Sequence, residues 1–169
     1  QAFDRELSIL SDFKDCKNLI KLQDYQEYAK KDGSIELFML LEYCAHGTLF
    51  DLIEEKCKIG LNGIMEEGEL YKILNDIANA LRCLHAKNIS HRDIKIENVL
   101  KGHDQNWKVC DFGSCTDLQY TAAQIKEDPE MVKDEIEKMT TPIYRAPEQI
   151  DLHRGTPITT KVDIWALGC

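Results

Sequence analysis

The sequence predicts an α+β fold that is mainly helical after residue 48. Two strand-like segments, 20–29 and 35–41, flank the turn signal at 31–34, which predicts a hairpin. Two shorter apolar segments, 99–100 and 107–110, flank a second turn. The strongest helical stripe in the chain predicts a long helix buried along one face, and it is formed by Leu70, Ile73, Leu74, Ile77, Leu81 and Leu84.

Further helices are predicted at the start of the chain and after the first hairpin. Residues 1–13 indicate the end of an amphipathic helix, with one apolar stripe made of Phe3, Leu7, Leu10 and Phe13. A short helix is expected over about 49–56. Residues 111–129 show little periodicity and predict no regular element.

The signal for the next helix is the sequence Asp128-Pro129-Glu130. It combines a capping oxygen, a proline suited to the first turn and an acid at the positive end of the helix dipole. The predicted helix is amphipathic and reaches Met139, with Asp134 placed to pair with Lys138. A last helix is expected to begin near residue 159 or 160.

Composition narrows the class of protein. With 169 residues, 43% of them apolar, the chain can bury one sizeable core. Its 21 basic and 30 acidic residues give a net charge of −9, which argues against general affinity for nucleic acid or anionic membranes. Seven cysteines without a C-x-x-C motif favour reduced thiols, and no apolar run is long enough to span a bilayer. A cytoplasmic protein is therefore expected.

Three motifs carry the chemical information: His-Arg-Asp-Ile-Lys-Ile-Glu-Asn at 91–98, Asp-Phe-Gly at 111–113 and Ala-Pro-Glu at 146–148. In this order and spacing they resemble the C-terminal two-thirds of a eukaryotic protein kinase domain. The resemblance implies that residues 1–43 form a partial small lobe, with the end of helix C and a hairpin. It also implies that residues 44–169 hold the hinge and a partial large lobe through the start of helix F. The sequence is interpreted as cut at both ends.

The resemblance assigns catalytic roles to the first two motifs. Transfer of a γ-phosphoryl group requires that its charge be neutralised and that a hydroxyl be aligned with it. Asp93 would accept the hydroxyl proton and Lys95 would lie against the γ-phosphate of ATP. Asn98 and Asp111 would supply oxygen ligands to Mg²⁺. The alternative, that these aspartates only cap turns, carries little weight for an ordered set of motifs.

A nucleotide site is implied by the stretch that follows the hairpin. The Glu42 carbonyl and the Cys44 amide would meet adenine, Leu41 would guard the back pocket and Leu100 would form the apolar floor. Glu6, on the first helix, would pair with a lysine that this sequence lacks. A strand end followed by a turn, and a solvated helical glutamate, are the alternatives for these positions.

Other residues indicate the serine/threonine type. Lys95 lies two positions after Asp93, and Thr141 would bond toward both residues, although a turn threonine is an equal alternative. Arg92 would be a buried cation that awaits a phosphate of the activation segment. Asp163 would accept backbone N–H bonds from the catalytic loop.

A finer resemblance is to the numb-associated kinase family, which includes the adaptor-associated and cyclin-G-associated kinases. It rests on residues 134–141, 144–148 and 158–169, on Cys110 before Asp111, and on the long activation segment with an extra helix. The departures are Gln149, Cys115 and Ser90. The resemblance implies protein substrates of the endocytic and clathrin-adaptor class.

The sequence contains neither G-x-G-x-x-G nor V-A-I-K. We therefore expect the 169 residues to be inactive alone and the parent chain to be an active, ATP- and Mg²⁺-dependent kinase. A pseudokinase or scaffold that binds partners without catalysis stays open as an alternative. A small-molecule kinase is disfavoured by Ala146-Pro147-Glu148 and by the segment at 163–165.

Overall fold

The computed structural model describes residues 2–60 and 64–169, and their side chains from residue 5 onward. The expected α+β class is confirmed. The elements in chain order are α1 Ala2–Asp12, β1 Leu22–Ala29, β2 Ile35–Leu41, α2 Leu49–Lys58, α3 Glu67–His85, β3 Val99–Lys101, β4 Trp107–Val109, α4 Ala122–Glu127, α5 Pro129–Met139, α6 Pro147–Ile150 and α7 Lys161–Leu167. Short 3-10 turns cover Ile96–Asn98, Pro142–Tyr144 and Leu152–Arg154.

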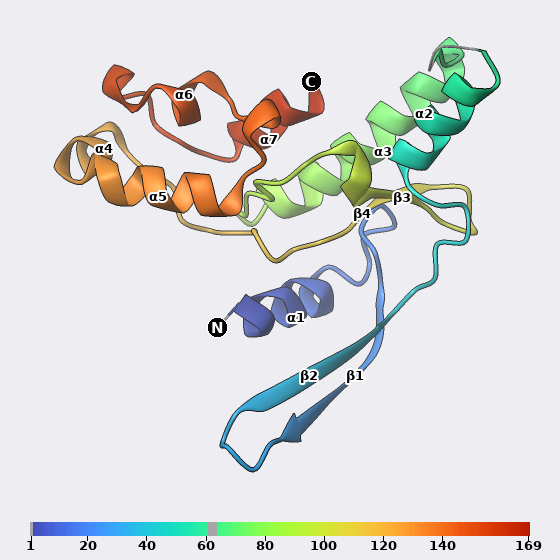
Figure 1. Cartoon of the computed structure of the whole chain (residues 1–169), viewed down its shortest axis with the longest axis horizontal. Helices are drawn as coiled ribbons and strands as arrows, with labels where there is room; N and C mark the ends of the chain where they lie inside the picture. Colours follow the sequence, from blue (N-terminus) through green and yellow to red (C-terminus); the bar gives the residue numbers. More distant parts are fainter. Residues whose placement is uncertain (1, 61–63) are drawn as a thin grey trace.

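The strands form two separate antiparallel hairpins. In the first, Leu22 pairs with Leu41 and Ala29 with Ile35, with one register shift between Leu22 and Asp24. In the second, β3 pairs with β4 from Val99–Val109 to Lys101–Trp107. Figure 1 shows the β1–β2 hairpin extending away from the helices, whereas β3 and β4 lie beside α3.

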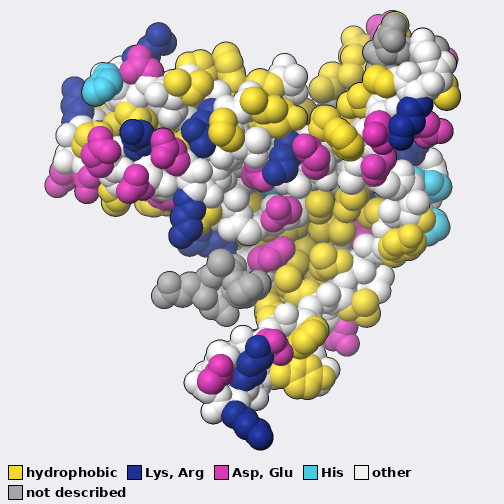
Figure 2. Space-filling model, viewed as in Figure 1, with side chains coloured by type: hydrophobic (Ala, Val, Ile, Leu, Met, Phe, Trp, Pro, Cys, Tyr) yellow, Lys and Arg dark blue, Asp and Glu magenta, His cyan; other side chains and the backbone are white. Residues whose placement is uncertain are grey.

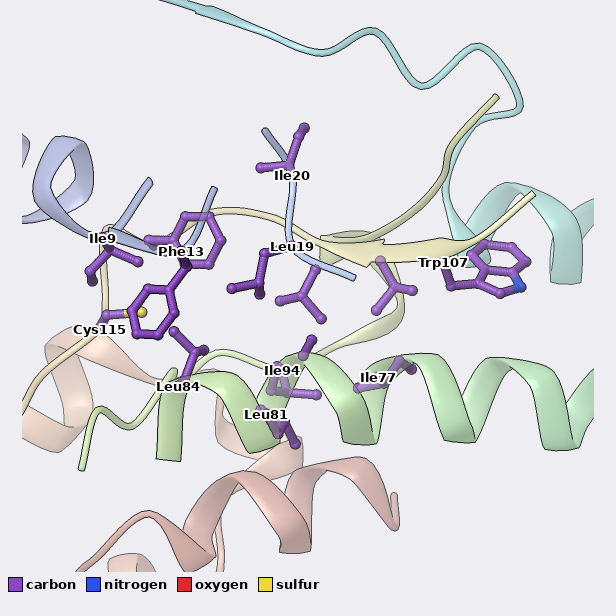
Figure 3. Close-up of a cluster of buried hydrophobic side chains, with 14 of the residues drawn as sticks. Ile9, Phe13, Leu19, Ile20, Ile77, Leu81, Leu84, Ile94, Trp107 and Cys115 are labelled. Carbon is purple, nitrogen blue, oxygen red and sulfur yellow. The ribbon is translucent and has the colours of Figure 1, made fainter. Parts of the chain in front are cut away.

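The main core forms where α1, α3 and the β3–β4 hairpin meet (Figure 3). Ile9, Phe13 and Leu19 pack from one side, and Ile77 and Leu81 from α3. Four members of the predicted α3 stripe are buried, namely Ile73, Ile77, Leu81 and Leu84. Its members Leu70 and Leu74 are instead 46% and 38% exposed, because they line an open apolar pocket between α2, α3 and α7. Phe3 of the first predicted stripe lies outside the described side chains.

A second, smaller core joins α4, α5 and α7 through Ile125, Val132, Ile136 and Val162. The helix α4 was not predicted, because six residues give too short a stripe to stand out. A capping box nevertheless marks its start, since Thr121 accepts from the Gln124 N–H and Gln124 accepts from the Thr121 N–H. The helix α5 begins at Pro129 with Asp128 as its cap, as expected.

On the face shown in Figure 2, basic side chains are interspersed with acidic ones. Within residues 2–60 and 64–169, no helix combines the length and the apolar character that crossing a membrane requires.

Candidate active site

Four predicted side chains meet in one polar network at the 3-10 turn Ile96–Asn98. Asp93 Oδ1 accepts from Thr141 Oγ1 at 2.6 Å, and Asp93 Oδ2 accepts from Lys95 Nζ at 2.7 Å. Lys95 Nζ also reaches Thr141 Oγ1 at 3.4 Å. Asn98 Nδ2 completes the network, because it donates to the Asp93 carbonyl at 2.9 Å and to Asp93 Oδ2 at 3.1 Å.

The network sets the ionisation of its two charged members. Partial burial acts to raise the pKa of Asp93, but hydrogen bonds from Lys95 and Thr141 outweigh it and hold this pKa below its usual value. The hydrogen bond to Asp93 raises the pKa of Lys95. At neutral pH the pair is therefore a carboxylate beside an ammonium group.

Asp163 on α7 fixes the backbone that carries this network. Its carboxylate is 1% exposed and accepts from the N–H groups of His91 and Arg92, both at 2.8 Å. His85 Nε2 lies 2.8 Å from the same carboxylate. Arg92 has φ 70°, a left-handed conformation that an arginine rarely adopts, so the two bonds from Asp163 stabilise a strained turn next to Asp93.

Asp111 and Asn98, the predicted metal ligands, are linked through Cys110, whose N–H donates to the Asn98 carbonyl at 3.0 Å. Because Asn98 uses its Nδ2 toward Asp93, its Oδ1 is left to act as a ligand. Asp111 is exposed, has φ 63° and accepts only from the Gly113 N–H, at 3.3 Å, within the described chain. No group of three His, Cys, Asp or Glu in that chain could hold a metal alone. One amide and one carboxylate oxygen suit Mg²⁺, which keeps several water or phosphate ligands.

Glu6 of α1 lies near the same place. Burial and then the charge of Asp111 raise the pKa of its carboxyl group, and they outweigh the opposite effect of the nearby Phe112 backbone. Phe112 in turn packs edge-on against His91, with ring centroids 5.7 Å apart, and Leu10 is buried in the same core. Burial lowers the pKa of His91, which is therefore a neutral packing group.

The predicted adenine-contacting residues lie at the end of β2, directly after it, and in β3. Leu41, Cys44 and Leu100 pack partly buried against the main core, and an isolated bridge joins Thr48 to Leu100. Neither the Glu42 carbonyl nor the Cys44 N–H has a hydrogen-bond partner in the described chain. A backbone acceptor and donor two residues apart are thus available to a ligand.

The side chain of Arg92 is 8% exposed and already has an acidic partner, which its prediction did not include. Arg92 Nη1 lies 2.5 Å from Glu135 Oε1 on α5, and Arg92 Nε donates to the Ser114 carbonyl at 2.6 Å. Tyr120 donates its hydroxyl to the same Glu135 carboxylate. The ion pair expected within α5, between Asp134 and Lys138, is not formed; the helix instead turns Glu135 toward Arg92.

Sequence analysis missed Glu135, Tyr120 and the buried Lys108. Glu135 directly follows Asp134, the acid that was predicted to pair with Lys138. The helical periodicity of the sequence does not show which of these two acids contacts an arginine that is distant in the chain. Lys108 lies between Trp107 and Val109, and all three side chains are buried. Strand alternation would turn Lys108 away from a core formed by its neighbours, so the sequence carries no clear sign of its burial.

The whole chain, residues 1–169, matches the protein kinase domain family, and it belongs to that family. Within the family its relatives are of the serine/threonine type, as the resemblance predicted. The chain is 37% identical over 167 residues to a protein named as a probable serine/threonine-protein kinase of Dictyostelium discoideum, covering 97% of this chain and 14% of that protein.

Two yeast relatives belong to the actin-regulating group. The chain is 36% identical over 166 residues to the actin-regulating kinase PRK1 of Saccharomyces cerevisiae, covering 96% of this chain and 20% of that protein. It is 40% identical over 139 residues to the actin-regulating kinase 1 of the same organism, covering 81% and 21%. The chain thus spans only about a fifth or less of the length of these relatives.

Proposed function

We propose that the protein containing this chain transfers the γ-phosphoryl group of ATP to serine or threonine hydroxyls of proteins. The observation that carries the proposal is the hydrogen bond between Thr141 and Asp93, with Lys95 bonded to both. It supports an acceptor site in which an ionised carboxylate orients a hydroxyl and an adjacent ammonium group neutralises phosphate charge.

Each residue then has a distinct task. Asp93 accepts the proton of the incoming hydroxyl, and its low pKa favours orientation of the nucleophile over early proton removal. Lys95 lies against the transferred group. Thr141 and Asn98 hold Asp93 in place from two sides.

ATP and Mg²⁺ are the substrate and cofactor that this set of donors suits. When bound, Mg²⁺ supplies positive charge to the phosphate oxygens. Asn98 Oδ1 and the Asp111 carboxylate would hold it, and Glu42 and Cys44 would bind adenine through the backbone. Leu41 and Leu100 would enclose the base, and Glu6 would keep Asp111 and Phe112 in register through the Phe112 backbone.

The acceptors are proposed to be proteins of the endocytic and clathrin-adaptor class, phosphorylated in the cytoplasm. The resemblance to the numb-associated kinases supports this substrate class. Residues 1–43 and 44–169 would be parts of the small and large lobes. Residues 1–169 alone are proposed to be inactive, because they contain neither the glycine-rich loop nor the phosphate-binding lysine.

The test uses the full-length protein, labelled ATP and an adaptor-derived peptide. Asp93→Asn should lower kcat by about a thousandfold while ATP affinity stays within about twofold, because only the carboxylate that orients the hydroxyl is lost. Asp32→Asn is the matched control, since Asp32 is an exposed aspartate in the β1–β2 turn. Retained turnover in Asp93→Asn would reject the proposal. ATP binding without transfer by the unaltered protein would identify a pseudokinase.

A further inference from the structure

Lys108, at the centre of β4, is among the most deeply buried side chains, with 2% exposure. A lysine is seldom buried to this degree unless its charge is paired. Its Nζ lies 3.0 Å from Glu42 Oε2 and 3.4 Å from Asp104 Oδ2. Burial acts to lower the pKa of Lys108, but these two carboxylates outweigh it and keep the ammonium group charged. One buried cation therefore joins two loops.

Glu42 is held from its other side as well. Its Oε1 accepts from the Lys21 N–H at 2.8 Å, and its own N–H donates to the Lys21 carbonyl at 2.9 Å. The two oxygens of one carboxylate thus connect β4 with the segment that precedes β1. Because three contacts converge on Glu42, its backbone has little freedom to rotate.

The β3–β4 turn, residues 102–106, closes over the same place. The Lys101 N–H donates to the Gly47 carbonyl at 2.9 Å, and Gln105 Nε2 lies 3.3 Å from His46 Nε2. Gly102 permits this close approach, since a Cβ there would lie 2.6 Å from Lys108 Cε and 2.7 Å from Asp104 Oδ1. The turn contacts the segment after Cys44 on one side and Lys108 on the other.

We propose that Lys108 is a positioning residue for the nucleotide, acting through Glu42. By fixing the Glu42 side chain, it holds the free Glu42 carbonyl and Cys44 N–H at the spacing and direction that adenine requires. The inference rests on the proposed function, which assigns adenine to these two backbone groups. Without the ammonium group, Glu42 and Asp104 would face each other as like charges and Glu42 would move.

The test compares the kinetics of Lys108→Met with those of the unaltered full-length protein. We expect KM for ATP and the dissociation constant of adenosine to rise about tenfold, with kcat and the peptide KM within about twofold. Partial unfolding would instead lower the concentration of active enzyme, and hence kcat, without moving KM. The KM-against-kcat split therefore separates positioning from a loss of stability.

Lys72→Met is the matched control. Lys72 pairs with Asp76 at 2.6 Å and reaches Asn106 of the same turn at 3.0 Å, yet it has no ion pair or hydrogen bond to residues 42–48. We expect KM for ATP to stay within about twofold in this variant, since only the side of the turn that faces α3 is altered.

The double variant Glu42→Gln/Lys108→Met is the sharper arm. Glutamine keeps an oxygen for the Lys21 N–H but carries no charge, so KM for ATP should return to within about threefold of the unaltered value. An unchanged KM for ATP in Lys108→Met would overturn the inference, and so would equal KM values in the single and double variants. In either case, phosphoryl transfer by the unaltered protein would still support the proposed function. An unaltered protein that binds ATP without transfer would overturn only the proposed kinase activity, because ATP affinity would still test Lys108. Failure to bind ATP at all would overturn both.

Discussion

Two buried cations, Arg92 and Lys108, form ion pairs in two different parts of the candidate site. The side chain of Arg92 is 8% exposed and pairs with Glu135, which is 26% exposed and lies on α5, after Asp111 in the chain. The side chain of Lys108 is 2% exposed and pairs with Glu42, which is 19% exposed and precedes the proposed catalytic residues. The first pair faces the proposed acceptor side and the second faces the proposed adenine side.

The two cations differ in geometry as well as in place. The guanidinium of Arg92 bonds a carboxylate and a carbonyl in two directions, and therefore orders the segment around Ser114 together with α5. The ammonium group of Lys108 is a point charge between two carboxylates. We expect loss of the first pair to affect kcat, and loss of the second to affect KM for ATP.

Among the changes that compare these two ion pairs, Glu135→Gln should show the largest effect. Arg92 would lose its charged partner, and α5, which leads directly into Thr140 and Thr141, would lose its link to the segment that carries Asp93. Because α5 leads into Thr141, whose hydroxyl bonds Asp93, we expect kcat to fall at least about tenfold with KM for ATP unchanged. Removal of one member of a buried pair should also cost about 3 kcal/mol in the free energy of unfolding. Steady-state kinetics with ATP and peptide varied separately measure both quantities.

Glu137→Gln controls for the loss of one negative charge, since Glu137 is exposed on the same helix. Equal kinetics in the two variants would contradict the role of the Arg92–Glu135 pair. Because Glu135 already occupies Arg92, phosphatase treatment of the unaltered protein should leave kcat unchanged. A loss of activity on treatment would show that a phosphate is needed as well.

Gly102→Ala should have a smaller effect, on the adenine side only. The added Cβ would meet Lys108 Cε at 2.6 Å, and the ion pairs of Lys108 leave that side chain little room to move. We expect a loss of about 1–3 kcal/mol in the free energy of unfolding, together with a higher KM for ATP. Gly68→Ala in α3 has no heavy atom within 4 Å of the new Cβ and should instead stabilise by up to about 1 kcal/mol. Urea denaturation of both variants tests the opposite signs.

The smallest expected effect is a difference in pH dependence. Burial acts to raise the pKa of Glu135, but Tyr120 and Arg92 outweigh it, so the folded pKa lies below the ordinary 4.5. Stability from this carboxylate is therefore complete above pH 4.5 and is lost as the pH falls through the folded pKa. Despite the burial of Lys108, Glu42 and Asp104 raise its pKa above the ordinary value of 10.5. The contribution of Lys108 to stability is therefore complete below pH 10.5 and is lost as the pH rises through its folded pKa.

Urea denaturation of Glu135→Gln and Lys108→Met from pH 3 to pH 11 separates these cases. The stability difference between Glu135→Gln and the unaltered protein should shrink in acid. The stability difference between Lys108→Met and the unaltered protein should shrink in alkali, where Lys108 loses its charge. It should otherwise shrink only in acid, where the partner carboxylates Glu42 and Asp104 become protonated. A difference for Glu135→Gln that persists below its folded pKa would show that the carboxylate charge contributes nothing.

Much of the fold could be predicted because its signals are local. The cap at Asp128 and the proline at 129 give the start of α5, and the turn at 31–34 gives the first hairpin. The exposed Leu70 and Leu74 show the limit of periodicity, which identifies a helical face without saying what covers each turn of it. The helix α4 was missed for its length, although its capping box was present in the sequence.

The sequence by itself determined the chemical groups of the candidate site, since Asp93, Lys95, Asn98 and Asp111 stand in motifs whose order and spacing define the kinase family. Only the tertiary structure determined which charges meet, namely Arg92 with Glu135 and Lys108 with Glu42. The physical reason is that helix and turn preferences act over a few residues, whereas a buried ion pair depends on two distant segments that packing brings within about 3 Å of each other.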